Sequence, residues 1–290
     1  MRRVNQMTNV WDYGRSLVQK LRGRRGRKIT KPFLLANFPV FCPDSANYWV
    51  QPEMTYRGAN AFPAQAAAIL EREGLLGQPR VLSAAAFGGA TDGARFQALL
   101  RTYNSSKTDV GYEAVYAAIF DHFVALSEPR ILEIGIGTTT KGLVSMIDAT
   151  CVPGGSLRAM RDYLPKALIF GADIDENILF SEDRIRTAFV DQTDPNVLAS
   201  LPQRLGAGTF DFIIDDGLHS PEANLNTLLF ALGVVRPGGW ILIEDIPRRA
   251  RPVWRLLAPL LSTGSLETWL IETKIGLMFV ARRLPVPAAM

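Results

Sequence analysis

With 290 residues, the chain is long enough for one α/β domain and an accessory region. Its residues are 48% hydrophobic and 21% charged, a composition typical of a folded protein. Its net charge of +4 comes largely from residues 15–32, and its two cysteines have neither metal-ligand spacing nor a disulfide framework, which favours a reducing compartment. No apolar run is long enough to span a bilayer and no signal peptide is visible, so we expect a cytoplasmic protein.

The first third of the chain divides into two regions. Residues 1–32 form a basic arm, which is either a solvated tail or, through residues 15–32, a contact for an anionic surface. Nucleic acid is disfavoured as a partner because the arm has few aromatic residues. Residues 33–105 are rich in aromatics and prolines and are interpreted as an accessory or cap region, with helices near 63–74 and 94–102.

From residue 106 to residue 290 the pattern alternates between strands and helices. Strands are predicted at 129–134, 168–173, 187–191, 210–215 and 240–244, and helices at 113–126, 156–163, 195–203, 222–235 and 250–261. Two final apolar runs, 266–272 and 276–282, are separated by too few residues for a crossover helix, so one of them must be antiparallel. The expected fold is α/β: a doubly wound, mostly parallel seven-stranded sheet that ends in an antiparallel hairpin.

A glycine turn follows the first of these strands, in the run Arg-Ile-Leu-Glu-Ile-Gly-Ile-Gly-Thr. Gly135 and Gly137 allow a tight turn and close approach of a ligand to bare backbone. The dinucleotide fingerprint needs a third glycine where this chain has Thr140, which disfavours a nicotinamide oxidoreductase. Glu133, just before the first glycine, is instead typical of the pocket for S-adenosylmethionine (SAM).

Three further strand and helix ends suit a nucleoside ligand. Asp173 ends the second strand, where an acidic side chain accepts hydrogen bonds from ribose hydroxyls. Without an inserted loop at 138–153, its spacing from the glycine turn would be the usual ~20 residues. Backbone N–H groups near Gly155 and Ser156 suit a carboxylate, and Asp191-Gln192 suits the adenine edge. The alternative for each aspartate is simple capping of a strand end.

The fourth and fifth strands end in acidic residues. Asp215-Asp216-Gly-Leu-His219 follows one strand, and Glu244-Asp245 closes the other. Carboxylates on neighbouring strands repel unless they are protonated or bridged by a cation, and oxygen ligands favour Mg²⁺, Mn²⁺ or Ca²⁺. The alternative is that these acids cap loops or pair with nearby arginines. His219 lies on the ligand face and can accept a proton near neutral pH, whereas the other histidine, His122, is interpreted as structural.

At these motifs the chain resembles the class I SAM-dependent methyltransferases, and more narrowly the metal-dependent sugar and macrolide O-methyltransferases of bacterial natural-product pathways. The resemblance implies that Asp216, Glu244 and Asp245 hold Mg²⁺ or Mn²⁺ and that His219 is the general base. It also places Asp215 with the cofactor-binding residues. Lys107-Thr108-Asp109 resembles the segment that closes over SAM, although the run after it is shorter here, and Thr108 is the cofactor contact expected from it.

The function predicted on this basis is SAM-dependent O-methylation of a hydroxyl on a small molecule or glycoside. A second copy of the chain is a further expected partner. Three alternatives stay open: a hydroxylase-type enzyme on the same scaffold, a nicotinamide oxidoreductase, and a non-catalytic SAM-binding protein, because a fold does not fix a function.

Overall fold

The computed structural model describes residues 50–285, except 90, 92, 109, 144, 145, 263 and 264, and side chains from residue 57 onward. The predicted basic arm at 1–32 lies outside the described residues. Contacts divide the chain into two compact units, 1–65 and 66–290. Helix α3 (Val50–Arg72) runs across this division and includes most of the helix predicted at 63–74.

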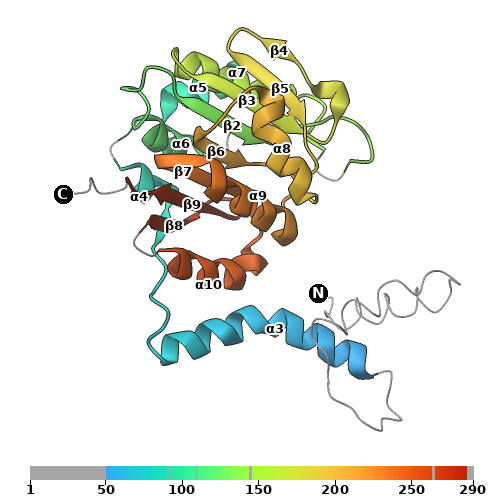
Figure 1. Cartoon of the computed structure of the whole chain (residues 1–290), viewed down its shortest axis with the longest axis vertical. Coiled ribbons are helices and arrows are strands. Elements are labelled where there is room, and N and C mark those ends of the chain that lie inside the picture. The colour runs from blue at the N-terminus through green and yellow to red at the C-terminus, as the bar shows by residue number, and fades with distance from the viewer. Residues whose placement is uncertain are drawn as a thin grey trace, which may run out of the picture. The chain divides into compact units, whose positions relative to one another are not determined.

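One nine-stranded sheet dominates the second unit (Figure 1). The strand order is β1-β8-β9-β7-β6-β2-β3-β5-β4, and its seven central strands are those predicted from the sequence. Their bounds are β2 Arg130–Ile134, β3 Leu168–Asp173, β5 Ile185–Phe189, β6 Phe210–Asp215, β7 Val235–Ile246, β8 Leu266–Glu272 and β9 Leu277–Arg283. Two short edge strands, β1 (Val81–Ser83) and β4 (Ser181–Glu182), extend the predicted sheet at its two sides.

The terminal hairpin has the predicted mixed direction. Strand β9 lies between β7 and β8 and is antiparallel to both, while β2, β3, β5, β6 and β7 pair in parallel. The register between β7 and β9 shifts between Ile243 and Ile246. This irregularity falls at Glu244 and Asp245, and Asp245 has a left-handed backbone with φ of 51°. The irregular end of β7 therefore departs from simple strand alternation at two predicted site residues.

Helices cover both faces of the sheet (Figure 1). On one face, α5 (Ala94–Thr102), α6 (Glu113–Phe120) and α7 (Gly155–Tyr163) pack on inward residues such as Ile131 and Phe212. On the other, α8 (Pro195–Leu205), α9 (Pro221–Val234) and α10 (Arg251–Leu261) pack on Leu132 and Ile213. Adjacent residues of one strand thus enter opposite cores, as the two-residue period of a strand requires.

The helices on the second face begin where the sequence provides caps. Asp194 accepts a hydrogen bond from the Asn196 backbone and is followed by Pro195, and Ser220 caps α9 in the same way. These residues satisfy backbone N–H groups that the first helical turn leaves unpaired. Four residues separate each cap from the end of the preceding strand, so both loops at this edge of the sheet are short.

The boundary predicted at residue 105 does not coincide with the division of the structure. Strand β1 pairs with β8, helix α4 (Ala84–Gly88) packs on α6, and α5 packs on α6 and α7. This part of the predicted accessory region belongs to the same compact unit as the sheet, because its apolar residues complete the core of one face. Among the described residues, no helix combines the length and the apolar character needed to cross a membrane.

Candidate functional site

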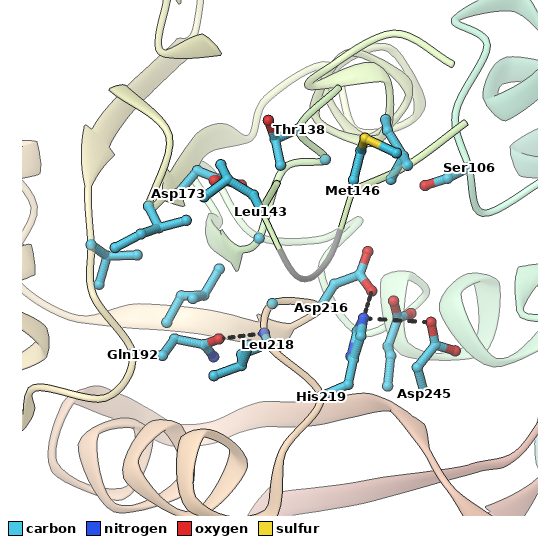
Figure 2. Close-up of a pocket in the computed structure, with 18 of the residues that line it drawn as sticks. Ser106, Thr138, Leu143, Met146, Asp173, Gln192, Asp216, Leu218, His219 and Asp245 are labelled. Carbon is cyan, nitrogen blue, oxygen red and sulfur yellow. Dashed lines mark hydrogen bonds and ion pairs between the residues drawn. The ribbon is translucent and has the colours of Figure 1, made fainter. Parts of the chain in front are cut away.

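A cavity of about 420 Å³ lies at the carboxyl ends of β2, β3, β5, β6 and β7 (Figure 2). Its volume is within the range of small-molecule sites, and its position is where open α/β sheets bind ligands. We call the ends of β2, β3 and β5 the cofactor half and the ends of β6 and β7 the acidic half. The predicted site residues on its wall are Gly135, Gly137, Asp173, Asp191, Gln192, Asp216, His219, Glu244 and Asp245.

The glycine turn forms the floor of the cofactor half. Gly135 has φ of 87°, and a Cβ built on it would lie 2.2 Å from the Asp216 carbonyl oxygen. Gly137 has φ of 86°, and a Cβ there would meet the Ile147 side chain at 2.8 Å. Both the backbone conformation and the lack of space therefore exclude larger residues, and the turn packs tightly against the loop after β6.

Asp173 reaches from β3 to the glycine turn. Its Oδ2 accepts from the Ile136 backbone N–H at 2.8 Å, and its Oδ1 accepts from the Asp175 N–H at 3.0 Å. Burial raises the pKa of this carboxyl, while the backbone hydrogen bonds oppose the shift. Each oxygen keeps a lone pair directed away from its backbone donor, so Asp173 can still accept from hydroxyls on a ligand.

Gln192 and Asp215 are hydrogen-bonded to each other beside the cavity. The Gln192 amide donates to Asp215 Oδ1 at 2.7 Å and to Thr227 Oγ1 at 2.9 Å, and it accepts from the Leu218 N–H at 2.7 Å (Figure 2). Asp215 is fully buried and also accepts from Asn224 Nδ2 at 3.1 Å. Both donors of Gln192 are thus used within the protein, although its side chain lines the cavity. Asp215, which the resemblance placed with the cofactor-binding residues, does not line the cavity.

Of the other predicted cofactor residues, some line the cavity and some do not. Asp191 lines it and accepts from the Thr193 N–H at 2.8 Å. Gly155 donates its N–H to the Val152 carbonyl, and Ser156 donates its hydroxyl to Glu133 Oε2 at 2.5 Å, so these helix-start groups are already paired and do not line the cavity. The Thr108 hydroxyl is buried and has no partner within the described part of the chain, and it also lies off the cavity wall.

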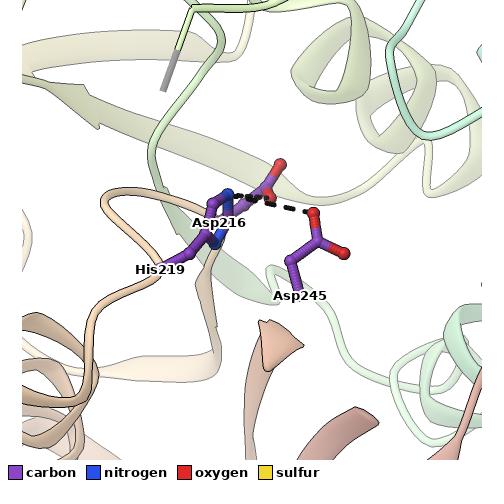
Figure 3. A group of neighbouring side chains, drawn as sticks. All are labelled: Asp216, His219 and Asp245. Carbon is purple, nitrogen blue, oxygen red and sulfur yellow. Dashed lines mark ion pairs between the residues drawn. The ribbon is translucent and has the colours of Figure 1, made fainter. Parts of the chain in front are cut away.

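A group that we call the outer cluster lies in the acidic half of the cavity and consists of Asp216, His219 and Asp245 (Figure 3). His219 Nε2 lies 3.7 Å from Asp216 Oδ1 and 3.8 Å from Asp245 Oδ2. The three side chains are 16–31% exposed, so solvent or a ligand can reach them. His219 Nδ1 is buried and finds no hydrogen-bond partner among the described residues. His219, like Asp245, has a left-handed backbone, with φ of 53°.

This donor set fits a hard divalent cation. Asp216 and Asp245 each direct a carboxylate oxygen toward the same space, and one potential ligand atom from each member of the outer cluster lies within 4.8 Å of the others. Mg²⁺ is commonly held by one or two carboxylates and completes its shell with water or substrate oxygens. Glu244, the third carboxylate assigned to the cation by resemblance, does not belong to this group among the residues described.

Glu244 instead belongs to a buried inner cluster with Lys107, Tyr116 and Glu133. The Lys107 ammonium donates to Glu244 Oε2, and the Tyr116 hydroxyl donates to Glu244 Oε1 at 2.7 Å. Burial alone would lower the pKa of Lys107, but the adjacent Asp216 and Glu244 carboxylates outweigh it and raise that pKa well above its ordinary value. Lys107 is therefore a buried, charged group at the base of the site.

Several wall residues were not among the predicted site residues. Tyr112 donates its hydroxyl to Asp245 Oδ1, and Lys107 pairs with Asp216 and Glu244. The loop at 138–153 contributes Thr138, Leu143, Met146 and Ile147 to the wall. The apolar residues of this otherwise irregular loop could have indicated from the sequence that it lines a cavity. By contrast, nothing in the sequence near Lys107 indicates that it pairs with Asp216 and Glu244, which are more than a hundred residues away.

The loop at 138–153 is tied to the third strand and to itself. The Thr138 and Thr140 hydroxyls donate to Asp175 Oδ2 at 2.5 and 2.6 Å, and the Ile147 N–H donates to the Thr138 carbonyl at 2.8 Å. These hydrogen bonds lower the pKa of Asp175 to about 2. They hold the start of the loop against the cofactor half of the cavity.

The segment from β2 to β7 is similar to a known protein family. Residues 132–246 match the family model described as a methyltransferase domain, and this segment contains the glycine turn, Asp173 and both acidic strand ends. This similarity covers less than half of the chain.

The chain is also similar to particular proteins. It is 41% identical over 120 residues to demethylmacrocin O-methyltransferase of Streptomyces fradiae, which covers 41% of this chain and 28% of that protein. It is 39% identical over 118 residues to mycinamicin VI 2''-O-methyltransferase of Micromonospora griseorubida, covering 40% of this chain and 27% of that protein. The matched stretch is thus less than a third of the length of either relative.

Among solved structures, the MycE methyltransferase from the mycinamycin pathway, in complex with Mg and SAH, is 30% identical. That match covers 52% of this chain and 36% of MycE, with a TM-score of 0.44. The O-methyltransferase TomG from Streptomyces achromogenes, in complex with SAM, is 15% identical with a TM-score of 0.39, over 67% of this chain and 92% of TomG.

Proposed function

We propose that this protein is a SAM-dependent O-methyltransferase that acts on a hydroxyl of a sugar or glycosylated natural product. The observation that carries the proposal is one cavity with two unlike halves: a glycine turn with Asp173 on one side, and the partly exposed outer cluster on the other. The sugar acceptor is proposed because two further relatives, 29% and 35% identical, are named as O-methyltransferases of rhamnosyl tetracenomycin-C.

The cofactor half would bind SAM. The bare backbone at Gly135 permits close approach of the ligand, and Asp173 would accept hydrogen bonds from its ribose hydroxyls. Leu143, Met146 and Ile147 offer apolar surface on the same cavity. These residues would align the methyl donor and exclude water, which are the two main tasks of a protein that catalyses direct methyl transfer.

The acidic half would prepare the acceptor. His219 would remove the proton from the reacting hydroxyl at Nε2, the ring nitrogen that faces Asp216 and Asp245. Those two carboxylates would hold Mg²⁺ or Mn²⁺, and a cation held there supplies positive charge that stabilises a deprotonated oxygen. Tyr112 would keep Asp245 in position through the hydrogen bond to Oδ1.

Product mass and chelation test this function. With SAM and glycosylated acceptors that carry a free sugar hydroxyl, we expect a product heavier by about 14 mass units, abolished by EDTA and restored by Mg²⁺ or Mn²⁺. Asp216→Asn should lose turnover and keep S-adenosylhomocysteine binding, because this carboxylate serves the acceptor. Asp183→Asn is the matched control, since that carboxylate is 89% exposed and does not line the cavity.

Two outcomes would contradict the proposal. A product heavier by about 16 mass units would indicate hydroxylation on the same scaffold. Full methyl transfer in EDTA, together with an Asp216→Asn variant that loses melting temperature and not rate, would show that the outer cluster is structural.

A further inference from the structure

Three carboxylates from three adjacent strands converge on one ammonium group. Glu133 is on β2, Asp216 follows β6 and Glu244 is on β7, and these strands are neighbours in the order β7-β6-β2. Lys107 Nζ lies 3.1 Å from Glu133 Oε1 and 2.5 Å from Asp216 Oδ2, and it donates to Glu244 Oε2. Lys107 is 4% exposed, so the ammonium is almost fully removed from water.

The oxygens of these carboxylates are divided between Lys107 and neutral donors. Glu133 uses its second oxygen to accept from Ser156, and Glu244 uses its second oxygen to accept from Tyr116. Asp216 differs: its Oδ1 accepts no hydrogen bond from the described side chains and faces His219 Nε2 at 3.7 Å. Within the described residues, Asp216 is therefore the one member of the three that joins the inner cluster to the outer cluster.

We propose that Lys107 is a built-in counter-cation that occupies the space among Glu133, Asp216 and Glu244 and so confines a divalent ion to the outer cluster. Lys107 is also a positioning residue, because it holds Asp216 Oδ2 and thereby turns Oδ1 toward His219 and Asp245. Clustering three carboxylates without a cation would be strongly unfavourable, and the one ammonium donates to Asp216 and Glu244 and forms an ion pair with Glu133 at 3.1 Å. Glu244 then acts through Lys107 and is not a ligand of the ion.

This assignment divides two residues that are adjacent in the sequence. Glu244 is fully buried and faces Lys107, while Asp245 is 31% exposed and faces His219. The two side chains therefore have different partners, Lys107 for Glu244 and His219 for Asp245, although they are adjacent in the chain. The inference rests on the proposed function in that the outer cluster is its cation site, but it does not depend on methyl transfer.

Titration with Mn²⁺ alone, followed by electron paramagnetic resonance, tests the assignment on the full chain. Asp216→Asn and Asp245→Asn should each weaken Mn²⁺ binding about tenfold or more, because each removes a charged oxygen ligand. Glu244→Gln should leave Mn²⁺ affinity within about twofold of the original protein, because Glu244 is separated from the ion by Lys107. An equal loss of affinity in Glu244→Gln would place the ion in the inner cluster and overturn the proposal.

Removal of the ammonium provides the second arm. Lys107→Met should bind Mn²⁺ at least about tenfold more tightly, or bind a second ion, because a repelling charge has gone and an acidic space is open. The double variant Lys107→Met with Glu244→Gln should lose this increase in Mn²⁺ affinity. Lys107→Arg keeps the positive charge and should bind Mn²⁺ as the original protein does. Unchanged Mn²⁺ binding in Lys107→Met would overturn the proposal.

Folding of the Lys107→Met variant is itself informative. If the variant folds poorly, Mn²⁺ should raise its melting temperature more than that of the original protein, since the ion would replace the missing positive charge. The Glu244→Gln comparison does not need this variant and decides the question independently. None of these measurements requires turnover, so the Mn²⁺ pattern can hold where methylation fails, and methylation can hold where the pattern fails.

Discussion

The two halves of the cavity differ in how fully their polar groups are already used. In the cofactor half, both oxygens of Asp173 accept backbone hydrogen bonds and the Gln192 amide is shared among three partners. In the acidic half, His219 lies more than 3.5 Å from its two carboxylate neighbours, and its Nδ1 has no partner in the part of the chain described. Among the described residues of the acidic half, the unused hydrogen-bonding capacity thus lies at His219.

The cofactor half is therefore suited to binding, and the acidic half is suited to chemistry. A pre-formed, satisfied wall loses little freedom when a ligand arrives, which favours affinity. Groups that are partly exposed and incompletely paired can still change partners during a reaction, and catalytic hydrogen bonds are often long before substrate is bound. The halves should therefore respond differently to substitution, and the following experiments are directed at that difference.

The largest effect is expected at His219. His219→Ala should lower methyl transfer about 10²–10⁴-fold, the usual range for a general base, with partial recovery at higher pH. Affinity for S-adenosylhomocysteine should stay nearly unchanged, because His219 lies in the acidic half. His122→Ala is the control, since that exposed histidine stacks near Trp240 and does not line the cavity. Normal turnover of His219→Ala would remove the chemical role from this half.

A smaller effect is expected at Asp173. Asp173→Ala should weaken S-adenosylhomocysteine binding by about 1–3 kcal/mol, since hydrogen-bond donors that faced the carboxylate are left unpaired. Calorimetry should show this loss, while Mn²⁺ affinity should change less than about twofold because the ion site is in the other half. If nucleoside affinity is unaltered and the fold is intact, the cofactor half has been assigned wrongly.

The smallest effect concerns Asp175 and disappears in acid. Its pKa is lowered to about 2 by the Thr138 and Thr140 hydroxyls. The stability contributed by the ionised form is complete above the ordinary carboxyl pKa of about 3.9 and is lost as the pH falls toward 2. Urea unfolding of the original protein and of Asp175→Asn should therefore differ at pH 5 and converge in acid. A difference that does not vary with pH would contradict this role.

Much of the fold could be predicted because parallel strands and capped helices leave local patterns. The strand at 168–173 and the helix at 94–102 were predicted with the bounds that the structure has. Strands β1 and β4 were missed because three and two residues are too few to show a period. Their pairing is decided by distant partners, such as β8 for β1, and not by their own sequence.

The site was predictable where a strand end alone decides the position. Gly135, Asp173 and Asp216 lie at the cavity because each closes or follows a parallel strand. The interpretation of Gln192 as an adenine contact stays a prediction, and the sequence did not show that its amide donates to Asp215 and Thr227. Lys107 could not be assigned to the carboxylates either, since 109 residues separate it from Asp216. Pairings of that kind are set by the packed fold and have no periodic signature.

The position of β9 has a consequence for how the chain is assembled. Strand β8 is made before β9, yet in the described sheet it reaches β7 only through β9, and β1 is attached only through β8. During synthesis from the N-terminus, the outer edge of β7 must wait for a strand that emerges later than its neighbours. Until then β7, with Glu244 and Asp245 at its end, is an open edge of the sheet, the kind of surface that pairs with other chains and that molecular chaperones shield.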